Sequence, residues 1–253
     1  MRTALKHEEI VRLNQDGVVT FGRILTDAEL VKARANVDRA VTAYTKHGNR
    51  PEKLDFIHTY DDYFASLVAH PRLLDVVESV IGPDIVLFSS HLLCKPDGDG
   101  REVAWHQDGA YWPIEPMNAI SLWLALDDCD AENGCMRMIP GTHIQGRLDH
   151  SFAEHEDDPV VMKTLDQHQY NVADAVDVCL KAGECSLHLP WIIHGSNANH
   201  SSRRRAGLPI RYIPGSTRVA PVDELSYNPD FPRLDYRKNI RLLRGQDQAG
   251  NFR

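Results

Sequence analysis

Residues 84–94, Asp84-Ile85-Val86-Leu87-Phe88-Ser89-Ser90-His91-Leu92-Leu93-Cys94, mark the point where the character of the sequence changes. The stretch is rich in branched and aromatic side chains, which is typical of a buried β-strand. Short apolar segments of the same kind follow at 103–107, 119–126, 134–139, 184–189 and 205–213, separated by Gly, Pro, Asp and Asn. Helices followed by many short strands predict a mainly β fold with flanking α-helices, built on a barrel or sandwich.

The residues before this stretch are mostly of helical character. Thr26 and Glu29 have the spacing of a capping box, and apolar residues then recur at helical spacing from Leu30 to Tyr44. Residues 17–21 resemble a short strand, and Gly82-Pro83 ends the helical part.

We expect a single domain over residues 1–253. It has a helical part at 1–83, a β core at 84–215 and a C-terminal tail at 216–253. Within the core, residues 141–182 are long, acidic and without clear periodicity. This is typical of a lid, a binding loop or a partly disordered segment.

Composition restricts the class of partner and the compartment. The net charge of −8 argues against a nucleic-acid partner, which would require a basic face. No apolar run is long enough for a membrane span. The cysteine count of 5 is odd and includes no CxxC pair, which favours a reducing cytoplasm over a disulfide framework.

The sequence Trp105-His106-Gln107-Asp108-Gly109 carries the candidate metal site. On a strand, residues i and i+2 share a face, so His106 and Asp108 would present an imidazole and a carboxylate side by side. His194, at the end of an apolar run, is the best third ligand. Two histidines and one carboxylate leave coordination positions open and favour non-haem Fe(II).

The His-x-Asp pattern is common by chance and is weak evidence by itself. A second example, His155-Glu156-Asp157, lies in an acidic stretch without apolar neighbours and is better interpreted as solvated surface. The neighbours of His106 indicate a buried strand end followed by an aromatic loop. Taken alone, they leave open that His106 is simply a hydrogen-bonded core histidine.

Arg205 favours a metal site over a core histidine at position 106, because it follows His194 by eleven residues. The planar, permanently charged guanidinium of arginine can grip a carboxylate through two hydrogen bonds. Arg203, Arg204 and Arg205 would alternate across a strand, and we expect Arg203 and Arg204 to lie on a solvated edge. Buried at the end of a barrel, Arg205 would hold the distal carboxylate of 2-oxoglutarate.

Together these motifs resemble the phytanoyl-CoA dioxygenase family of Fe(II)/2-oxoglutarate-dependent oxygenases. The similarity is carried by WHQDGAYW (105–112), AISLWLALDDCDAENGCMRMIPGTH (119–143) and HGSNANHSSRRRAGLPIRYIP (194–214). It covers about residues 10 to 215, and it implies a double-stranded β-helix, the cupin-like jelly roll. It also implies that the iron ligands are His106, Asp108 and His194.

The resemblance extends to residues around the metal. Ser196 and Lys95 match residues beside the co-substrate, although an exposed lysine at a strand end is the other interpretation of Lys95. Trp123 matches an aromatic residue near the co-substrate, with one residue fewer between it and the aspartate than the family has; core packing is its alternative role. Tyr111 and Trp112 follow the metal loop and are expected to line the substrate pocket.

The implied reaction is hydroxylation of an unactivated C–H bond in a small metabolite, with O2 consumed and succinate and CO2 released. Asp108 favours hydroxylation over halogenation, because halogenating relatives have a small residue at this position. The alternatives are a cupin-type dioxygenase that does not use 2-oxoglutarate, with His188 or His200 as further ligands, a non-catalytic metal-binding barrel, and a zinc hydrolase. The polar, basic segment 223–253 is a candidate for packing on the barrel or for a homodimer contact, and the substrate stays open.

Overall fold

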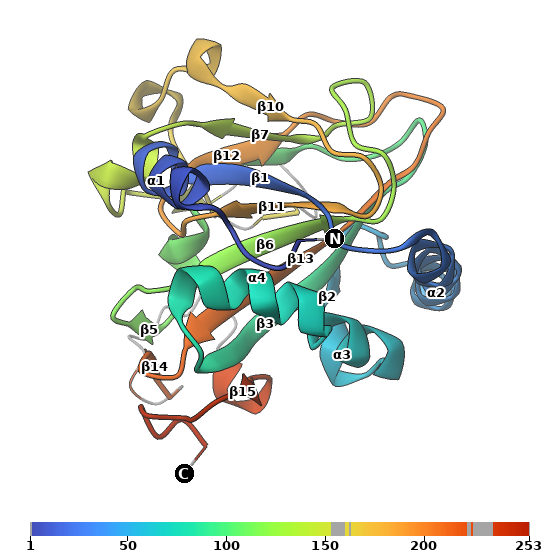
Figure 1. The fold of residues 1–253 in the computed structure, drawn as a ribbon. Coiled ribbons are helices and arrows are strands. Elements are labelled where there is room, and N and C mark those ends of the chain that lie inside the picture. The colour runs from blue at the N-terminus through green and yellow to red at the C-terminus, as the bar shows by residue number, and fades with distance from the viewer. Residues whose placement is uncertain (1, 153–159, 162, 222–223, 225–234, 253) are drawn as a thin grey trace.

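Two antiparallel β-sheets form the centre of the molecule (Figure 1), which is a computed structural model. The described residues are 2–152, 160–161, 163–221, 224 and 235–252. The strands of both sheets come from distant parts of the chain, which is the antiparallel arrangement of a jelly roll. The predicted fold, a mainly β jelly roll with flanking helices, is confirmed.

The larger sheet has the order β1-β11-β6-β13-β3-β15, and β2 pairs with β3. Its strands are β1 (Val18–Arg23), β2 (Leu54–Asp55), β3 (Ile85–Lys95), β6 (Ile120–Ala125), β11 (Glu184–His188), β13 (Arg205–Pro214) and β15 (Arg241–Arg244). The smaller sheet has the order β10-β7-β12-β4. It consists of β4 (Val103–His106), β7 (Met136–Ile139), β10 (Val176–Val178) and β12 (Ile193–Ser196).

Helices of the N-terminal part accompany the larger sheet: α1 (His7–Asp16), α2 (Asp27–Thr45), α3 (Asp62–Val68) and α4 (Pro71–Ile81) (Figure 1). The predicted capping box starts α2. The Glu29 amide donates to Thr26 Oγ1 over 3.2 Å, and the Thr26 amide donates to Glu29 over 2.8 Å. A large hydrophobic core joins the apolar faces of these helices to the outer face of the sheet, through residues such as Val37, Leu74 and Ile210. The helices therefore brace the sheet from outside.

A second hydrophobic cluster lies between the two sheets. Trp123 and Ala125 of β6 pack there with Met136 and Met138 of β7 and with Val178 of β10. Side chains alternate along each strand, so the larger sheet sends one set of residues to the helices and the other set to this interior. The functional candidates belong to the interior set.

Residues 141–182 are more structured than the sequence indicates. Their described residues contain short 3₁₀ turns (Thr142–Gln145, Gln167–Gln169, Val172–Asp174), the paired strands β8 (Ser151–Phe152) and β9 (Lys163–Thr164), and β10. The strand β10 joins the smaller sheet by pairing with β7. The second His-x-Asp motif, at 155–157, lies outside the described residues.

The tail packs on the barrel. Ile240 is buried, and β15 pairs with β3 at the edge of the larger sheet. The remaining short elements are 3₁₀ turns at Ile57–Thr59, Asp108–Tyr111 and Tyr236–Lys238, and the strands β5 (Ile114–Glu115) and β14 (Arg218–Val219). The division into one domain with these three parts stays a prediction.

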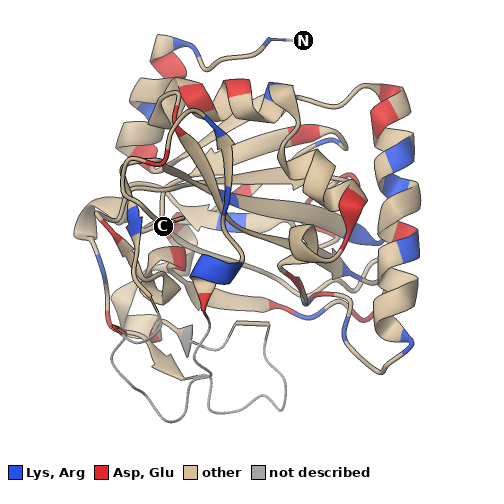
Figure 2. Cartoon of the chain, turned by 90° about the horizontal axis from the view of Figure 1, so that it is seen from below, with Lys and Arg blue, Asp and Glu red and all other residues tan. Residues whose placement is uncertain are grey.

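Two further expectations concern partners. None of the helices in the described part of the chain is long and apolar enough to cross a bilayer. Figure 2 shows acidic and basic residues interspersed along α2 and over the face seen there. Such mixing of both signs is ordinary for a protein surface.

Candidate active site

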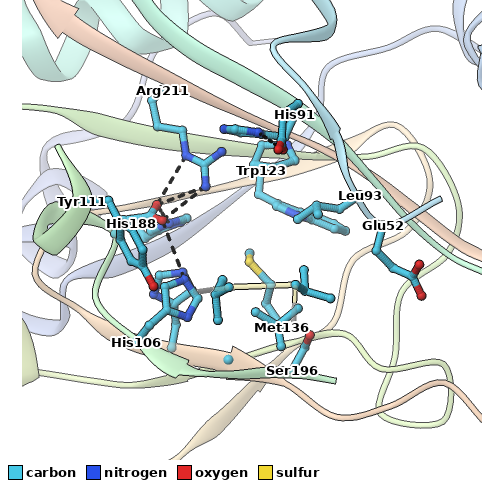
Figure 3. Close-up of a pocket in the computed structure, with 18 of the residues that line it drawn as sticks. Glu52, His91, Leu93, His106, Tyr111, Trp123, Met136, His188, Ser196 and Arg211 are labelled. Carbon is cyan, nitrogen blue, oxygen red and sulfur yellow. Dashed lines mark hydrogen bonds and ion pairs between the residues drawn. The ribbon is translucent and has the colours of Figure 1, made fainter. Parts of the chain in front are cut away.

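A cavity of about 450 Å³ opens between the two sheets, and most of the candidate residues line it (Figure 3). They are His106, Asp108, Tyr111, Trp112, Trp123, His194, Ser196 and Arg205. Lys95 is the one sequence-predicted residue that does not line the cavity itself; it lies behind Ser196. A volume of this size is typical of a site for small molecules.

His106 and His194 are direct partners across neighbouring antiparallel strands, β4 and β12. Their ring centroids are 4.2 Å apart, and both side chains are buried. The Nδ1 atom of His106 lies 2.8 Å from the carbonyl of Ala104, and Nδ1 of His194 lies 3.1 Å from the carbonyl of Ile192. Each Nδ1 can therefore donate its proton to the backbone, which leaves each Nε2 as a free lone pair.

The carboxylate of Asp108 lies beside the two imidazoles as expected, although Asp108 itself is not on a strand. The strand β4 ends at His106, and Asp108 begins a 3₁₀ turn. The alternation still holds, because the intervening Gln107 keeps an extended backbone with φ −117° and ψ 125°. The side-chain amide of Gln107 donates to the carbonyls of Gly146 and Trp191 over 2.9 and 2.7 Å, which anchors the turn.

Both oxygens of the Asp108 carboxylate are held by residues of the larger sheet. Oδ2 accepts a hydrogen bond of 3.1 Å from Ser121, and it lies 3.4 Å from Nε of Arg211 and 3.5 Å from Nε2 of His188. These three residues occupy one row of the sheet, because Ser121 pairs in register with both His188 and Arg211. Oδ1 accepts a hydrogen bond of 3.2 Å from Nη2 of Arg211 and lies 3.8 Å from Nε2 of His106.

The charge state of the triad also suits a metal. Burial alone would raise the pKa of Asp108, but the Arg211 guanidinium and the neighbouring histidines hold it well below its usual range. Burial and the neighbouring His106 lower the pKa of His194, so its imidazole is neutral near pH 7. The ligand atoms of His106, Asp108 and His194 all lie within 4.8 Å of one another. Two imidazoles and a carboxylate on one side of a cavity fit a non-haem iron(II) ion.

Arg205 lies at the other end of the cavity and is 1% exposed. Its Nε and Nη2 atoms donate to the carbonyl of Gly134 over 3.0 and 2.7 Å, and Nη2 lies 3.3 Å from Oγ of Ser196. Among the described residues, no carboxylate forms an ion pair with Arg205. A buried cation without a counter-charge is costly, so the pocket is prepared for an anionic ligand.

Lys95 is buried beside this arginine, not exposed as its alternative interpretation held. It is the register partner of Arg205 on β3. Its Nζ donates to Oγ of Ser196 over 2.7 Å and to the carbonyl of Asn197. Burial, together with the charge of Arg205, lowers the pKa of Lys95 to about 6.

Trp123 packs in the core and also faces the arginine end of the cavity. It belongs to the cluster between the sheets, and Cζ of Arg205 lies 5.5 Å from its ring centroid. Its Nε1 is buried without a hydrogen-bond partner in the described part of the chain. An acceptor atom from a bound molecule would satisfy this donor.

Residues 13–207 match the profile of the family described as phytanoyl-CoA dioxygenase (PhyH), which is most of the chain. The chain belongs to the phytanoyl-CoA dioxygenase family. The predicted family is confirmed, and with it the class of enzyme: a 2-oxoglutarate-dependent non-haem iron oxygenase.

Individual members of this family are similar over most of their length. Ectoine dioxygenase of Bordetella parapertussis is 24% identical, over 96% of this chain and 86% of that protein. L-proline trans-4-hydroxylase of Streptomyces griseoviridis is 25% identical, over 80% of this chain and 84% of that enzyme. Among solved structures, the non-heme monooxygenase ThoJ in its apo form has a TM-score of 0.73 and 30% identity. That alignment covers 96% of this chain and 85% of the ThoJ chain.

The two aromatic residues predicted for the substrate pocket of this family member both line the cavity. The ring of Tyr111 meets that of His106 edge-on, with centroids 6.3 Å apart. Trp112 packs edge-on against Phe88, with centroids 5.6 Å apart. Both residues lie on the iron side of the cavity, away from Arg205.

The other two arginines of the run are not on a strand, which begins only at Arg205. Arg203 is exposed and pairs with Asp130, as expected for a solvated residue. Arg204 differs from the expectation. Its side chain is 29% exposed and pairs with Asp127 and Asp38, so it links the barrel to α2.

Sequence reasoning missed Arg211 and Ser121, and considered His188 only as a ligand of another enzyme class. The position of Arg211 in the sequence could have identified it as a cavity residue. It lies six residues after Arg205 on the same strand, and an even spacing places both on the face that looks into the barrel.

Proposed function

We propose that this protein is an Fe(II)- and 2-oxoglutarate-dependent dioxygenase that hydroxylates an unactivated C–H bond of a small metabolite. One oxygen atom of O2 enters the product, and 2-oxoglutarate is converted to succinate and CO2. The observation that carries the proposal is the position of His106, Asp108 and His194 in one cavity with the buried, uncompensated Arg205.

We assign His106, Asp108 and His194 as the iron ligands. When bound, iron would supply the activation of O2, which no protein side chain can do. The protein residues place and orient the ion. The backbone carbonyls of Ala104 and Ile192 orient the imidazoles, and Ser121 with Arg211 directs the carboxylate.

We assign Arg205, Ser196, Lys95 and Trp123 to 2-oxoglutarate. Arg205 would take the distal carboxylate through its guanidinium, and the Ser196 hydroxyl would hydrogen-bond the same group. Lys95 supports Ser196 from behind through its 2.7 Å hydrogen bond. The indole N–H of Trp123 is a further donor facing this end of the cavity.

Tyr111 and Trp112 would bound the substrate and exclude water near the iron. The activities for which ectoine dioxygenase and L-proline trans-4-hydroxylase are named support a small-molecule substrate. We propose no nucleic-acid or membrane partner and a cytoplasmic location. Self-association through the tail stays a proposal as well.

The alternative classes have less support. In a cupin-type enzyme that does not use 2-oxoglutarate, His188 would be a further ligand, but it does not belong to the group of ligand atoms that lie within 4.8 Å of one another. The other candidate, His200, is exposed. A zinc hydrolase or a non-catalytic barrel would have no use for Arg205 as an uncompensated buried cation.

Anaerobic titration of the iron-loaded protein with 2-oxoglutarate tests the proposal. We expect a visible charge-transfer band from chelation of Fe(II), and after admission of O2 we expect succinate in step with the loss of 2-oxoglutarate. Asp108→Ala should lose both signals. A wild-type protein that binds iron but gives neither band nor succinate would falsify the proposed function.

A further inference from the structure

The cavity has a second polar end, away from Arg205, that the proposed reaction does not use. The strand β3 sends Lys95 towards the co-substrate end, and residues at even spacing, Leu93 and His91, line the cavity farther along. The short strand β2 pairs with β3 here and places Asp55 opposite His91. Figure 3 shows His91 and Arg211 near each other at this end, with Glu52 and Ser196 on other sides of the cavity.

Asp55 offers a carboxylate to this end. Its Oδ1 lies 2.6 Å from Nδ1 of His91, and no partner of Oδ2 is found among the described residues. The side chain is 59% exposed and lines the cavity. The surrounding protein removes water and would raise the pKa of Asp55, but His91 and Arg211 lower it, so the group is ionised.

Aromatic residues line the same cavity as this carboxylate. Phe56 has φ 50°, the left-handed region that bulky side chains rarely adopt, and is the one non-glycine residue with positive φ in the described chain. In this conformation its ring lies 5.4 Å from His91 and 5.9 Å from Tyr236, measured between centroids. Tyr236, from the tail, is in turn stacked on Phe88 at 4.8 Å.

The other carboxylates that line the cavity already have a role or a partner within the protein. Asp108 belongs to the triad. Glu52 is bound by Arg50, at 2.8 Å, and by the backbone amide of Arg101, at 3.0 Å. Among the described cavity residues, Asp55 is therefore the carboxylate that can accept a hydrogen bond from a ligand.

We propose that Asp55, in a cavity also lined by Phe56 and Tyr236, binds a protonated amine of the substrate. A carboxylate beside aromatic faces is the arrangement that attracts an ammonium group, through charge and through the ring quadrupoles. The inference rests on the proposed function and deepens it. It assigns the substrate to the small organic amines, including amino acids, with the nitrogen held at the Asp55 end and the carbon skeleton directed along the apolar walls towards the iron.

The test uses the anaerobic Fe(II)·2-oxoglutarate complex of the full chain, whose visible band reports a molecule that arrives beside the metal. The probes are matched five-membered rings: pyrrolidine with an amine only, cyclopentanecarboxylate with an acid only, and L-proline with both, together with piperidine and cyclohexylamine as larger amines. We expect the amine-bearing probes to perturb the band and the acid alone to leave it unchanged. Asp55→Asn should weaken amine binding by about tenfold or more, because a charge-assisted hydrogen bond is lost.

Asp62→Asn is the matched control, since Asp62 is an exposed carboxylate on α3 outside the cavity, and its amine affinities should equal those of the wild type. The band of the Asp55→Asn complex without probe should also be that of the wild type, because Asp55 contacts neither triad nor Arg205. Preference for the acid, absence of binding by every amine, or equal amine affinity in wild type and Asp55→Asn would each overturn the inference. Failure of the proposed function would be distinct, since no band would then form before any probe is added.

Discussion

Arg205 and Arg203 lie two positions apart in one arginine run, yet their surroundings differ completely. Arg203 pairs with Asp130 at the surface, whereas Arg205 is buried, with a backbone carbonyl and a hydroxyl as its neighbours. A buried cation of this kind is stable only if an anion compensates its charge. Within the run, the spacing from His194 singles out Arg205, because this spacing matches the family that the sequence resembles.

Replacement of Arg205 should therefore affect the co-substrate and not the metal. We expect Arg205→Ala to raise the Kd for 2-oxoglutarate by about a hundredfold or more, since a buried bidentate ion pair is lost. Iron affinity should stay as in the wild type, because Arg205 contacts none of the triad. Calorimetric titration measures both, with Arg203→Ala as the control. Unchanged 2-oxoglutarate affinity in Arg205→Ala would remove this residue from the co-substrate site.

The lowered pKa of Lys95 predicts that binding of 2-oxoglutarate is linked to proton uptake. Its pKa of about 6 means that it is mostly neutral at neutral pH, because burial and Arg205 disfavour its charge. The arrival of a carboxylate beside Ser196 should raise that pKa and draw a proton onto Lys95. We expect 2-oxoglutarate binding near neutral pH to take up a fraction of a proton, approaching one. Calorimetry in buffers of different ionisation enthalpy measures the uptake, and Lys95→Met should abolish it. A binding enthalpy that is the same in every buffer contradicts this linkage.

The limits of sequence reasoning at this scale are visible at Arg211 and Ser121. Both lie within stretches that resemble the family, but their role depends on register with a neighbouring strand. Register between strands far apart in the chain depends on packing that no local pattern contains. Asp55 and Tyr236 were missed for the same reason, since they reach the cavity from parts of the chain interpreted as helical and tail.

Elements with strong local signals were predicted closely. The capping box at Thr26 starts α2, and the apolar segment 205–213 became β13, Arg205–Pro214. Elements without such signals were not. β10 is three residues long, and the sequence of β15, Arg-Leu-Leu-Arg, has no alternation; both strands are held by pairing with a neighbour already in place. The turn at Asp108 replaced an expected strand because Gln107 is anchored by two carbonyls from other segments.

The start of α2 predicts a pH dependence of stability. Burial would raise the pKa of Glu29, but hydrogen bonds from Thr26 and His70 and the charge of Arg72 lower it from 4.5 to about 2. A carboxyl with a lowered pKa in the folded state contributes stability that is complete above its unfolded pKa and is lost as pH falls through its folded pKa. We therefore expect Glu29→Gln to be most destabilising above about pH 4.5, with the difference from wild type disappearing towards pH 2.

Urea denaturation of both proteins across this range measures the effect. The contribution should be modest, because Glu29 is 36% exposed and solvent screens its charges. A difference between the two proteins that is equally large at pH 3 and pH 7 would assign the effect to the shape of the side chain and not to its charge.

At the scale of the whole molecule, the triad and Arg205 would connect the two sheets through bound ligands. Iron would join β4, β12 and the turn at Asp108, and 2-oxoglutarate would connect these to β13. A ligand that binds only the folded state stabilises it by about 2.7 kcal/mol at a concentration of one hundred times Kd. For a domain of this size we expect Tm to rise by about 5–10 °C with iron and 2-oxoglutarate present.

Differential scanning calorimetry with iron alone, with 2-oxoglutarate alone and with both separates the contributions. Removal of the metal by a chelator should return Tm to the value of the unloaded protein and should also cancel the shift due to 2-oxoglutarate. A 2-oxoglutarate shift that persists in the chelated protein would mean that the co-substrate binds without iron.

The order of strands in the larger sheet has a consequence for folding during translation. β3 ends at residue 95, yet its main neighbours, β13 and β15, begin at residues 205 and 241. Most of the backbone of this long, hydrophobic strand therefore stays unpaired during translation until the distant residues of β13 have been synthesised. Such an edge can pair with other chains. The yield of active protein should therefore depend on chaperones that shield nascent chains and on slow synthesis at low temperature, more than on the stability of the finished fold.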